Sequence, residues 1–264
     1  MSTTTTTGQR EPATVELAYQ ESGQGDPLLL VMGLGASGDA WLPHSSVWSR
    51  RYRCVVVDNR GAGRSPAPPG PYTTAAMADD YARLIRRLGA SRVRVVGISM
   101  GGAIAQELAL RHPHLVARIV LVATWARCDA YTAEWLSVLT RVRAQADSAT
   151  ATALLQSLIW TPRWFAEHLS ELLDERATPS AMSQQAFESQ ATACASHNAY
   201  DRLPRIAVPT LVTAGAVDAF IHPDLSAEVA ERIPGARLEL FAGGHAHHWE
   251  DLDRFNEMVE GWLA

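Results

Sequence analysis

The chain has 264 residues, of which 47% are hydrophobic, so it is long enough for one substantial core or for a core with a small appended subdomain. The formal net charge is −5 and the 23 basic residues form no long run, which argues against a surface that binds nucleic acid or an anionic membrane. No apolar stretch approaches the roughly 20 residues of a membrane span.

The N-terminal segment is rich in threonine and almost free of apolar residues. We expect residues 1–12 to be a disordered tail, because so polar a segment cannot offset the entropy lost on ordering. The segment also lacks the apolar core of a secretory signal. Cys54, Cys128 and Cys194 are widely spaced and form no CxxC pair, so neither a disulfide framework nor a zinc site is indicated. We therefore expect a soluble, cytoplasmic protein without a metal or a cofactor.

Short apolar runs alternate with longer amphipathic segments along the rest of the chain. The runs are rich in branched residues and too short for helices, which is typical of buried parallel strands. They cover residues 27–32, 54–58, 93–97, 119–123, 210–215 and 236–241. Helical patterns cover residues 73–89, with Thr73 or Thr74 as N-cap, and residues 100–113, 227–235 and 253–264. This alternation predicts an α/β protein whose mostly parallel sheet has helices on both faces.

The alternation is interrupted once, between about Thr124 and Arg205. Helical patterns without a convincing strand fill this stretch, and a structureless loop of that length would be improbable. We interpret residues 124–205 as an inserted helical cap. Residues 13–123 and 206–264 would then form the α/β core.

A serine occupies the tight corner between the run at 93–97 and the helical pattern that follows it. The stretch Gly97-Ile98-Ser99-Met100-Gly101 fits G-x-S-x-G, and its position between a predicted strand and a predicted helix gives the motif its weight. A serine on such a strained turn projects its hydroxyl above the sheet, and small neighbours relieve the crowding. The next backbone N–H lies in the first turn of a helix, where it is available to an oxyanion. The alternative is an ordinary glycine-rich turn with a capping serine.

At these residues the chain resembles the α/β-hydrolase family, over nearly its whole length after the tail. It is most similar to the cap-bearing branch with 3-oxoadipate enol-lactonases, small esterases and polyketide methylesterases. The stretches that carry the resemblance are LLLVMGLGASGDAW, VVVDNRGAGRSPAPPGPYT, VVGISMGGAIAQELALRHP, VPTLVTAGAVDAFIHP and GGHAHHWEDLDRFN. The loop DNRGAGRS in the second stretch is expected to be structural rather than catalytic.

The resemblance implies a catalytic triad in the order serine, acid, histidine. Ser99 is the nucleophile that it implies. Asp218 follows a late strand in a stretch similar to the family's acid loop, and Asp129, after the preceding strand, is the alternative acid. His245 matches the histidine of the family's Gly-His pair. His247 and His248 are expected to be packed in the core or to line the pocket.

The same resemblance implies an oxyanion hole made of backbone N–H groups. Its donors would be Leu34, in the loop after an early strand, and Met100, directly after the serine. The family usually has His-Gly before the first donor, where this chain has Met32-Gly33. The change removes a side chain that normally braces this loop, but it leaves the donor itself in place.

Aromatic residues are the main indication of the substrate. We predict a pocket lined by Trp41, Trp125, Trp160, Trp164 and His248, although aromatic residues at helical spacing often belong simply to a core. Such a lining favours a small or medium, largely apolar substrate. Arginines of the insert could hold a carboxylate or lie on solvated helix faces, namely Arg127, Arg141, Arg143 and Arg163.

Three functions remain open at this point. The first is a serine hydrolase that cleaves a carboxylic ester or lactone through an acyl-enzyme on Ser99. The second uses the same residues as a cofactor-free C–C hydrolase, eliminase, cyclase or acyltransferase, because a fold does not determine its function. The third is a ligand-binding protein without activity. In each case we expect a small-molecule partner, no nucleic acid or membrane, and a monomer or homodimer.

Overall fold

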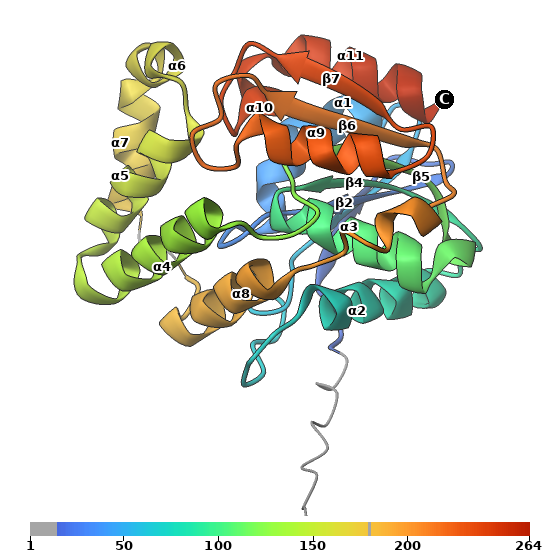
Figure 1. Ribbon diagram of the computed structural model, residues 1–264, viewed down its shortest axis with the longest axis horizontal. Helices are drawn as coiled ribbons and strands as arrows, with labels where there is room; N and C mark the ends of the chain where they lie inside the picture. Colours follow the sequence, from blue (N-terminus) through green and yellow to red (C-terminus); the bar gives the residue numbers. More distant parts are fainter. Residues whose placement is uncertain (1–14, 179–180) are drawn as a thin grey trace, which may run out of the picture.

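A computed structural model of the chain describes residues 15–178 and 181–264, and the predicted tail at 1–12 lies outside the described residues. In the described part of the chain a seven-stranded sheet has the order β1-β3-β2-β4-β5-β6-β7 (Figure 1). Its strands are β1 (Tyr19–Ser22), β2 (Pro27–Val31), β3 (Arg53–Val57), β4 (Val93–Ile98), β5 (Val116–Val122), β6 (Thr210–Gly215) and β7 (Arg237–Phe241). Only the β1–β3 pair is antiparallel among the described strands, so the predicted mostly parallel sheet is confirmed.

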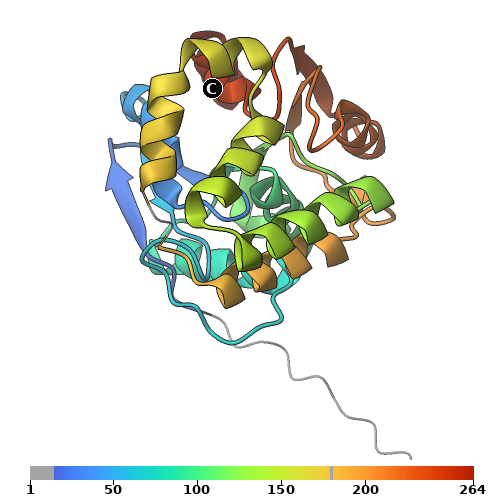
Figure 2. The same ribbon diagram turned by 90° about the vertical axis from the view of Figure 1, so that its left-hand side faces the viewer.

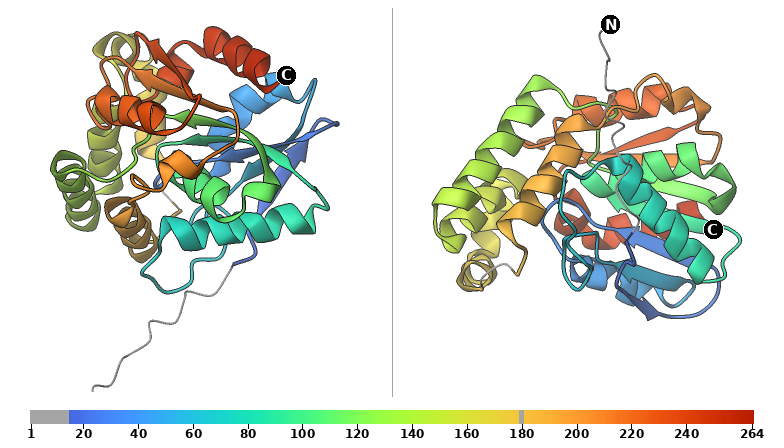
Figure 3. Two further views of the ribbon diagram at one scale, coloured as in Figure 1. Left: turned by 45° about the vertical axis from the view of Figure 1, so that its right-hand side comes forward. Right: turned by 90° about the horizontal axis from the view of Figure 1, so that it is seen from below.

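Alternate side chains of the strands pack on opposite faces of the sheet. In β2, Leu29 and Val31 belong to one buried cluster, whereas Leu28 and Leu30 belong to another. Helices α2 (Thr74–Arg87), α3 (Met100–Arg111) and α9 (Pro223–Arg232) contribute to the first cluster. Helices α1 (Leu42–Trp48) and α11 (Leu252–Leu263) contribute to the second. The sheet is therefore covered by helices on both faces, as Figure 3 shows from two sides.

The insert between β5 and β6 is helical. It contains α4 (Ala130–Gln145), α5 (Ser148–Ile159), α6 (Pro162–Glu167), α7 (Leu169–Ala177) and α8 (Gln184–Ser196). Figures 1 and 2 show these helices as a layer beside the sheet, with α4 and α8 next to each other. Contacts from this layer reach the loops that follow β2 and β7, so it lies where the parallel strands end.

Among the residues described, no helix combines the length and the apolarity that crossing a bilayer requires.

Candidate active site

Ser99 is the single residue between β4, which ends at Ile98, and α3, which begins at Met100. Its φ is 54° and its ψ is −119°, a backbone conformation that costs a non-glycine residue about 1–3 kcal/mol. Surrounding contacts hold the turn: Ser99 N–H donates to Val122 O at 2.8 Å, and Thr124 Oγ1 donates to Ser99 O at 2.9 Å. The buried serine is thus fixed by the neighbouring strand rather than by its own preference.

The glycines around Ser99 allow the turn to pack closely on the sheet. A Cβ on Gly101 would lie 2.2 Å from Val31 O, and one on Gly97 would lie 2.3 Å from Gly101 O. On the other side, a Cβ on Gly33 would lie only 3.8 Å from Ser99 Oγ. The loop after β2 therefore passes directly beside the serine hydroxyl.

His245 and Asp218 are joined by a buried hydrogen bond, with 2.8 Å between His245 Nδ1 and Asp218 Oδ2. The second oxygen, Asp218 Oδ1, accepts the N–H groups of Phe220 at 2.8 Å and Ile221 at 2.9 Å. The Phe220 ring also packs edge-on against the imidazole, with 5.2 Å between the centroids. These contacts fix the orientation of the carboxylate and of the imidazole.

Ser99, Asp218 and His245 follow β4, β6 and β7, and all three leave the sheet at the edge where these parallel strands end. Backbone hydrogen bonds continue the pairing past the strands: Ser99 N–H to Val122 O (2.8 Å), Ala123 N–H to Thr213 O (2.9 Å) and Ala216 N–H to Phe241 O (2.7 Å). The loops that carry the predicted residues are therefore held in one continuous framework.

Asp129, the alternative acid, has a different role in the structure. Its Oδ1 accepts the N–H of Thr132 at 2.7 Å, which makes it the N-cap of α4. The hydrogen bond to His245 is made by Asp218.

The loop after β2, residues 32–38, carries the predicted donor Leu34 and is held by three polar side chains. Asn59 Nδ2 donates to Met32 O at 2.7 Å, and Gly38 N–H donates to Asp58 Oδ1 at 2.8 Å. Gly35 N–H donates to Gln190 Oε1, from α8 of the insert, at 3.0 Å. Asp58 and Asn59 belong to the DNRGAGRS loop, which was expected to be structural. Gln190 was not anticipated from the sequence.

The five predicted pocket residues divide into two groups. Trp41 and His248 are buried together, with 5.6 Å between their ring centroids, and Trp125 is buried against His197. Trp160 and Trp164 are half-buried in the insert, and their rings stack with 3.7 Å between the centroids. Whether they line a substrate pocket stays a prediction.

Burial disfavours the charged form of three histidines that pack together near His245, namely His44, His247 and His248. Burial lowers the pKa of His247 from 6.5 to about 3 and the pKa of His44 from 6.5 to about 4. The His44 ring stacks on the His248 ring, with 5.3 Å between the centroids. Burial also lowers the pKa of His248 well below its ordinary value. At neutral pH these rings therefore pack as uncharged aromatic groups.

Each of the four insert arginines named in the sequence analysis has a partner within the protein. Ion pairs connect Arg127 with Glu228, Arg141 with Glu134 and Arg163 with Glu167. The Arg143 guanidinium carbon lies 5.0 Å from the centroid of the Phe187 ring, and the guanidinium donates to Met182 O. That they hold a substrate carboxylate stays a prediction.

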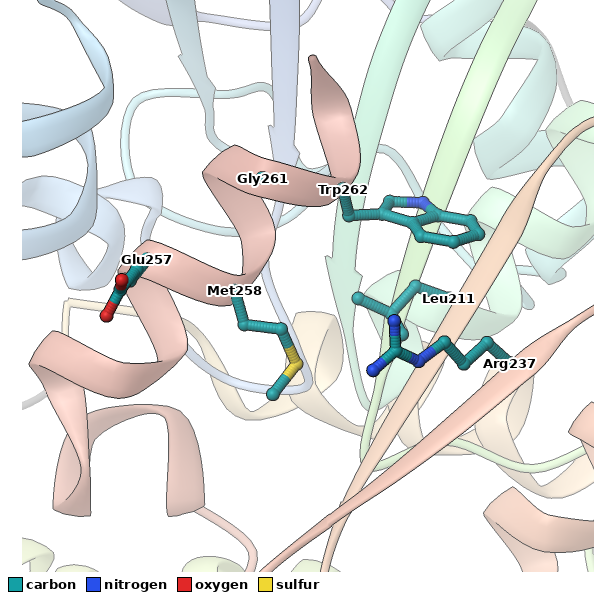
Figure 4. A pocket seen from close by; sticks show the side chains of 6 residues that line it. All are labelled: Leu211, Arg237, Glu257, Met258, Gly261 and Trp262. Carbon is teal, nitrogen blue, oxygen red and sulfur yellow. The ribbon is translucent and has the colours of Figure 1, made fainter.

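A pocket of about 260 Å³ lies at the opposite end of the sheet, where β6 and β7 begin (Figure 4). It is lined by Leu211, Arg237, Glu257, Met258, Gly261 and Trp262. Because Ser99, Asp218 and His245 follow the other ends of their strands, this pocket is separate from the candidate active site.

Comparison with known proteins places the chain in a family. A family profile described as the alpha/beta hydrolase fold matches residues 26–252, so the chain belongs to the α/β-hydrolase family of enzymes. Its relatives include the candidate carbamate hydrolase RutD of Azorhizobium caulinodans, 32% identical over 94% of this chain and 95% of the relative. They also include the candidate non-heme bromoperoxidase BpoC of Mycobacterium tuberculosis, 32% identical over 95% of this chain and 98% of the relative.

Among solved structures, the enol-lactonase from Burkholderia xenovorans is similar to this chain with a TM-score of 0.88 and 26% identity, over 94% of this chain and 96% of that one. The likeness confirms the fold that the sequence predicts.

Proposed function

We propose that this α/β hydrolase cleaves a carboxylic ester or lactone of small-to-medium, largely apolar character through an acyl-enzyme on Ser99. The observation that carries the proposal is the buried 2.8 Å hydrogen bond between His245 and Asp218 at the sheet edge that also presents Ser99. A serine hydroxyl is a weak nucleophile, and a histidine oriented by a carboxylate is the base that activates it.

Acylation begins when Ser99 Oγ attacks the substrate carbonyl carbon and His245 Nε2 takes the hydroxyl proton. Asp218 keeps the proton on Nδ1 and stabilises the imidazolium that forms. The N–H groups of Leu34 and Met100 donate to the oxyanion. The tetrahedral intermediate collapses as the bond to the leaving oxygen breaks, and His245 returns its proton to that oxygen.

Deacylation repeats the sequence with water as the nucleophile. His245 takes a proton from water, hydroxide oxygen attacks the acyl carbon, and the proton then passes to Ser99 Oγ as the acid leaves. In a lactone the alcohol and the acid belong to one product, so hydrolysis opens the ring.

Two relatives support an acyl substrate. One is called an enol-lactonase and another a candidate carbamate hydrolase, and both substrate classes contain a carbonyl carbon that a nucleophile can attack. The half-buried tryptophans of the insert, Trp160 and Trp164, favour an apolar acyl or alkyl group.

The test begins with a fluorophosphonate and intact-mass analysis of the parent protein and Ser99→Ala. We expect one adduct on the parent, mapped to Ser99, and none on the variant. A panel of esters, lactones and carbamates, with products identified by mass, then identifies the substrate class. A folded parent protein without an adduct and without turnover on the panel would overturn the proposal.

A further inference from the structure

Gln190 connects the helical insert to the loop that carries the predicted oxyanion donor. It lies on α8 with no exposed surface, and its Oε1 accepts Gly35 N–H at 3.0 Å. Its Nε2 donates to Arg60 O at 2.8 Å. The side-chain orientation follows from the partners, because an N–H requires the amide oxygen and a carbonyl requires the amide nitrogen.

The other partner of Gln190 is a buried residue held by an ion pair. Arg60 is buried and forms an ion pair with the equally buried Asp80, with 2.6 Å between Nη2 and Oδ2. Gln190 therefore connects Gly35 to a second loop, at a residue that is buried and ion-paired. A second residue of α8 adds to the contact, since a Cβ on Gly35 would lie 2.9 Å from the Phe187 ring.

The bridge restricts the neighbouring donor through the backbone. Leu34 N–H and Gly35 N–H lie on either side of the Leu34 Cα, so fixing the second limits rotation of the first. Gly35 also has a φ of 81°, a conformation that favours glycine, and glycine has the most backbone freedom of any residue, so an external hydrogen bond restricts this position more than it would restrict another. The usual histidine of the family is replaced by Met32 at the start of this loop, and Gln190 supplies a polar contact within three residues of it.

We propose that Gln190 is a positioning residue that aims the Leu34 N–H at the oxyanion, so that the helical insert sets the geometry of catalysis as well as covering the site. This inference rests on the proposed function. Loss of an oxyanion donor itself costs about 10²- to 10³-fold in kcat. Loosening the loop should cost less, on the order of 10- to 100-fold.

The experiment compares Gln190→Met with the parent and with Gln184→Met. Methionine keeps the length of glutamine and removes both hydrogen bonds. Gln184 is the matched control because it lies on the same helix and donates instead to Thr140 O and to Glu188. Gln190→Ala gives a second variant should methionine not be accommodated. The measurements are amide hydrogen exchange of residues 32–38, the rate of fluorophosphonate labelling, and kcat and KM for the best ester.

For Gln190→Met we expect faster exchange of residues 32–38, slower labelling, and a kcat lowered about 10- to 100-fold with KM within about twofold of the parent. Gln184→Met should match the parent in all four readouts. Unchanged exchange would show that the bridge does not hold the loop. Faster exchange with parental labelling and kcat would show that the bridge is structural only. A parent that neither labels nor turns over would instead overturn the proposed function, while exchange would still report on the bridge.

Discussion

At the scale of single residues, the two carboxylate oxygens of Asp218 have different hydrogen-bond partners. One oxygen accepts the N–H groups of Phe220 and Ile221, and the other accepts from His245 Nδ1. In Asp218→Asn the amide oxygen can keep the backbone contacts, but the NH₂ group then faces Nδ1 and favours the wrong tautomer of His245. We expect kcat for the best ester to fall about 10³- to 10⁴-fold.

Steady-state kinetics measure this effect, and thermal unfolding provides the control. The melting temperature should change little, because the two backbone hydrogen bonds remain. A kcat within tenfold of the parent would contradict the role of Asp218 that we propose.

The sequence points to individual residues where a motif has a fixed place in the fold. Ser99 could be located because a strand pattern, a G-x-S-x-G and a helix pattern adjoin one another. Gln190 could not, because its partner Gly35 is 155 positions away and α8 contains several similar glutamines. A hydrogen bond across such a separation depends on how the insert packs, and no local pattern encodes that.

At the scale of elements, β2 to β6 were predictable because both faces of these strands are largely buried and continuous apolar runs result. The parallel edge strand β7 is partly exposed, and its residues alternate between polar and apolar. The strand predicted at 210–215 has the same bounds as β6. The strand predicted at 119–123 covers only the second half of β5, which begins at Val116. β1 was missed, because it is an edge strand with partly exposed, mostly polar side chains. The short helix α1 was missed as well, since LPHSSVW has no room for a helical period to repeat.

Another element-scale feature joins the insert to the loop of His245. Glu250 of α10 (His247–Glu250) accepts Thr161 N–H at 2.7 Å and Gly244 N–H at 3.2 Å. Ala246 N–H donates to Ile159 O at 3.0 Å beside it. Glu250 therefore connects the corner between α5 and α6 with the residue before His245.

Glu250→Gln leaves the shape nearly unchanged but replaces one acceptor oxygen with a donor that faces an N–H. We expect faster trypsin cleavage within residues 124–205 and a kcat/KM lowered on the order of tenfold, because each N–H left without a partner costs about 1–3 kcal/mol. Glu257→Gln, the same change on an exposed position of α11, is the control and should resemble the parent. Equal cleavage rates for the two variants would contradict the connection.

At the scale of the whole molecule, buried neutral histidines make the free energy of unfolding depend on pH. Burial lowers the pKa of His44 to about 4 and that of His247 to about 3, from an ordinary 6.5. Between these values and 6.5 the unfolded chain binds more protons than the folded one. The contribution of each histidine to stability is therefore complete above about pH 6.5. It is lost as the pH falls toward 4 for His44 and toward 3 for His247, by at most roughly 1.4 kcal/mol per pH unit for each histidine.

Urea unfolding between pH 7.5 and 4.5 measures this dependence, and His44→Gln isolates one contribution. The variant removes a titrating ring while keeping a side chain that can bond to Asn256 Oδ1, the partner of His44 Nδ1 at 2.7 Å. We expect a shallower loss of stability below pH 6.5 than in the parent. If the free energy of unfolding depended on pH equally in the variant and the parent, His44 would have the same pKa in the folded and the unfolded chain.

The contact between Gln190 and Gly35 also bears on how such an enzyme diverges. A segment inserted between two strands of a sheet is readily exchanged in evolution, and such an exchange would ordinarily alter which molecules are accepted without altering the reacting groups. In this chain the exchangeable segment also holds part of the loop beside Ser99. The positioning role that we propose for Gln190 would link selectivity and turnover. A chimaera that carries a relative's residues 124–205 would retain its rate only if the graft brought an amide oxygen back to Gly35.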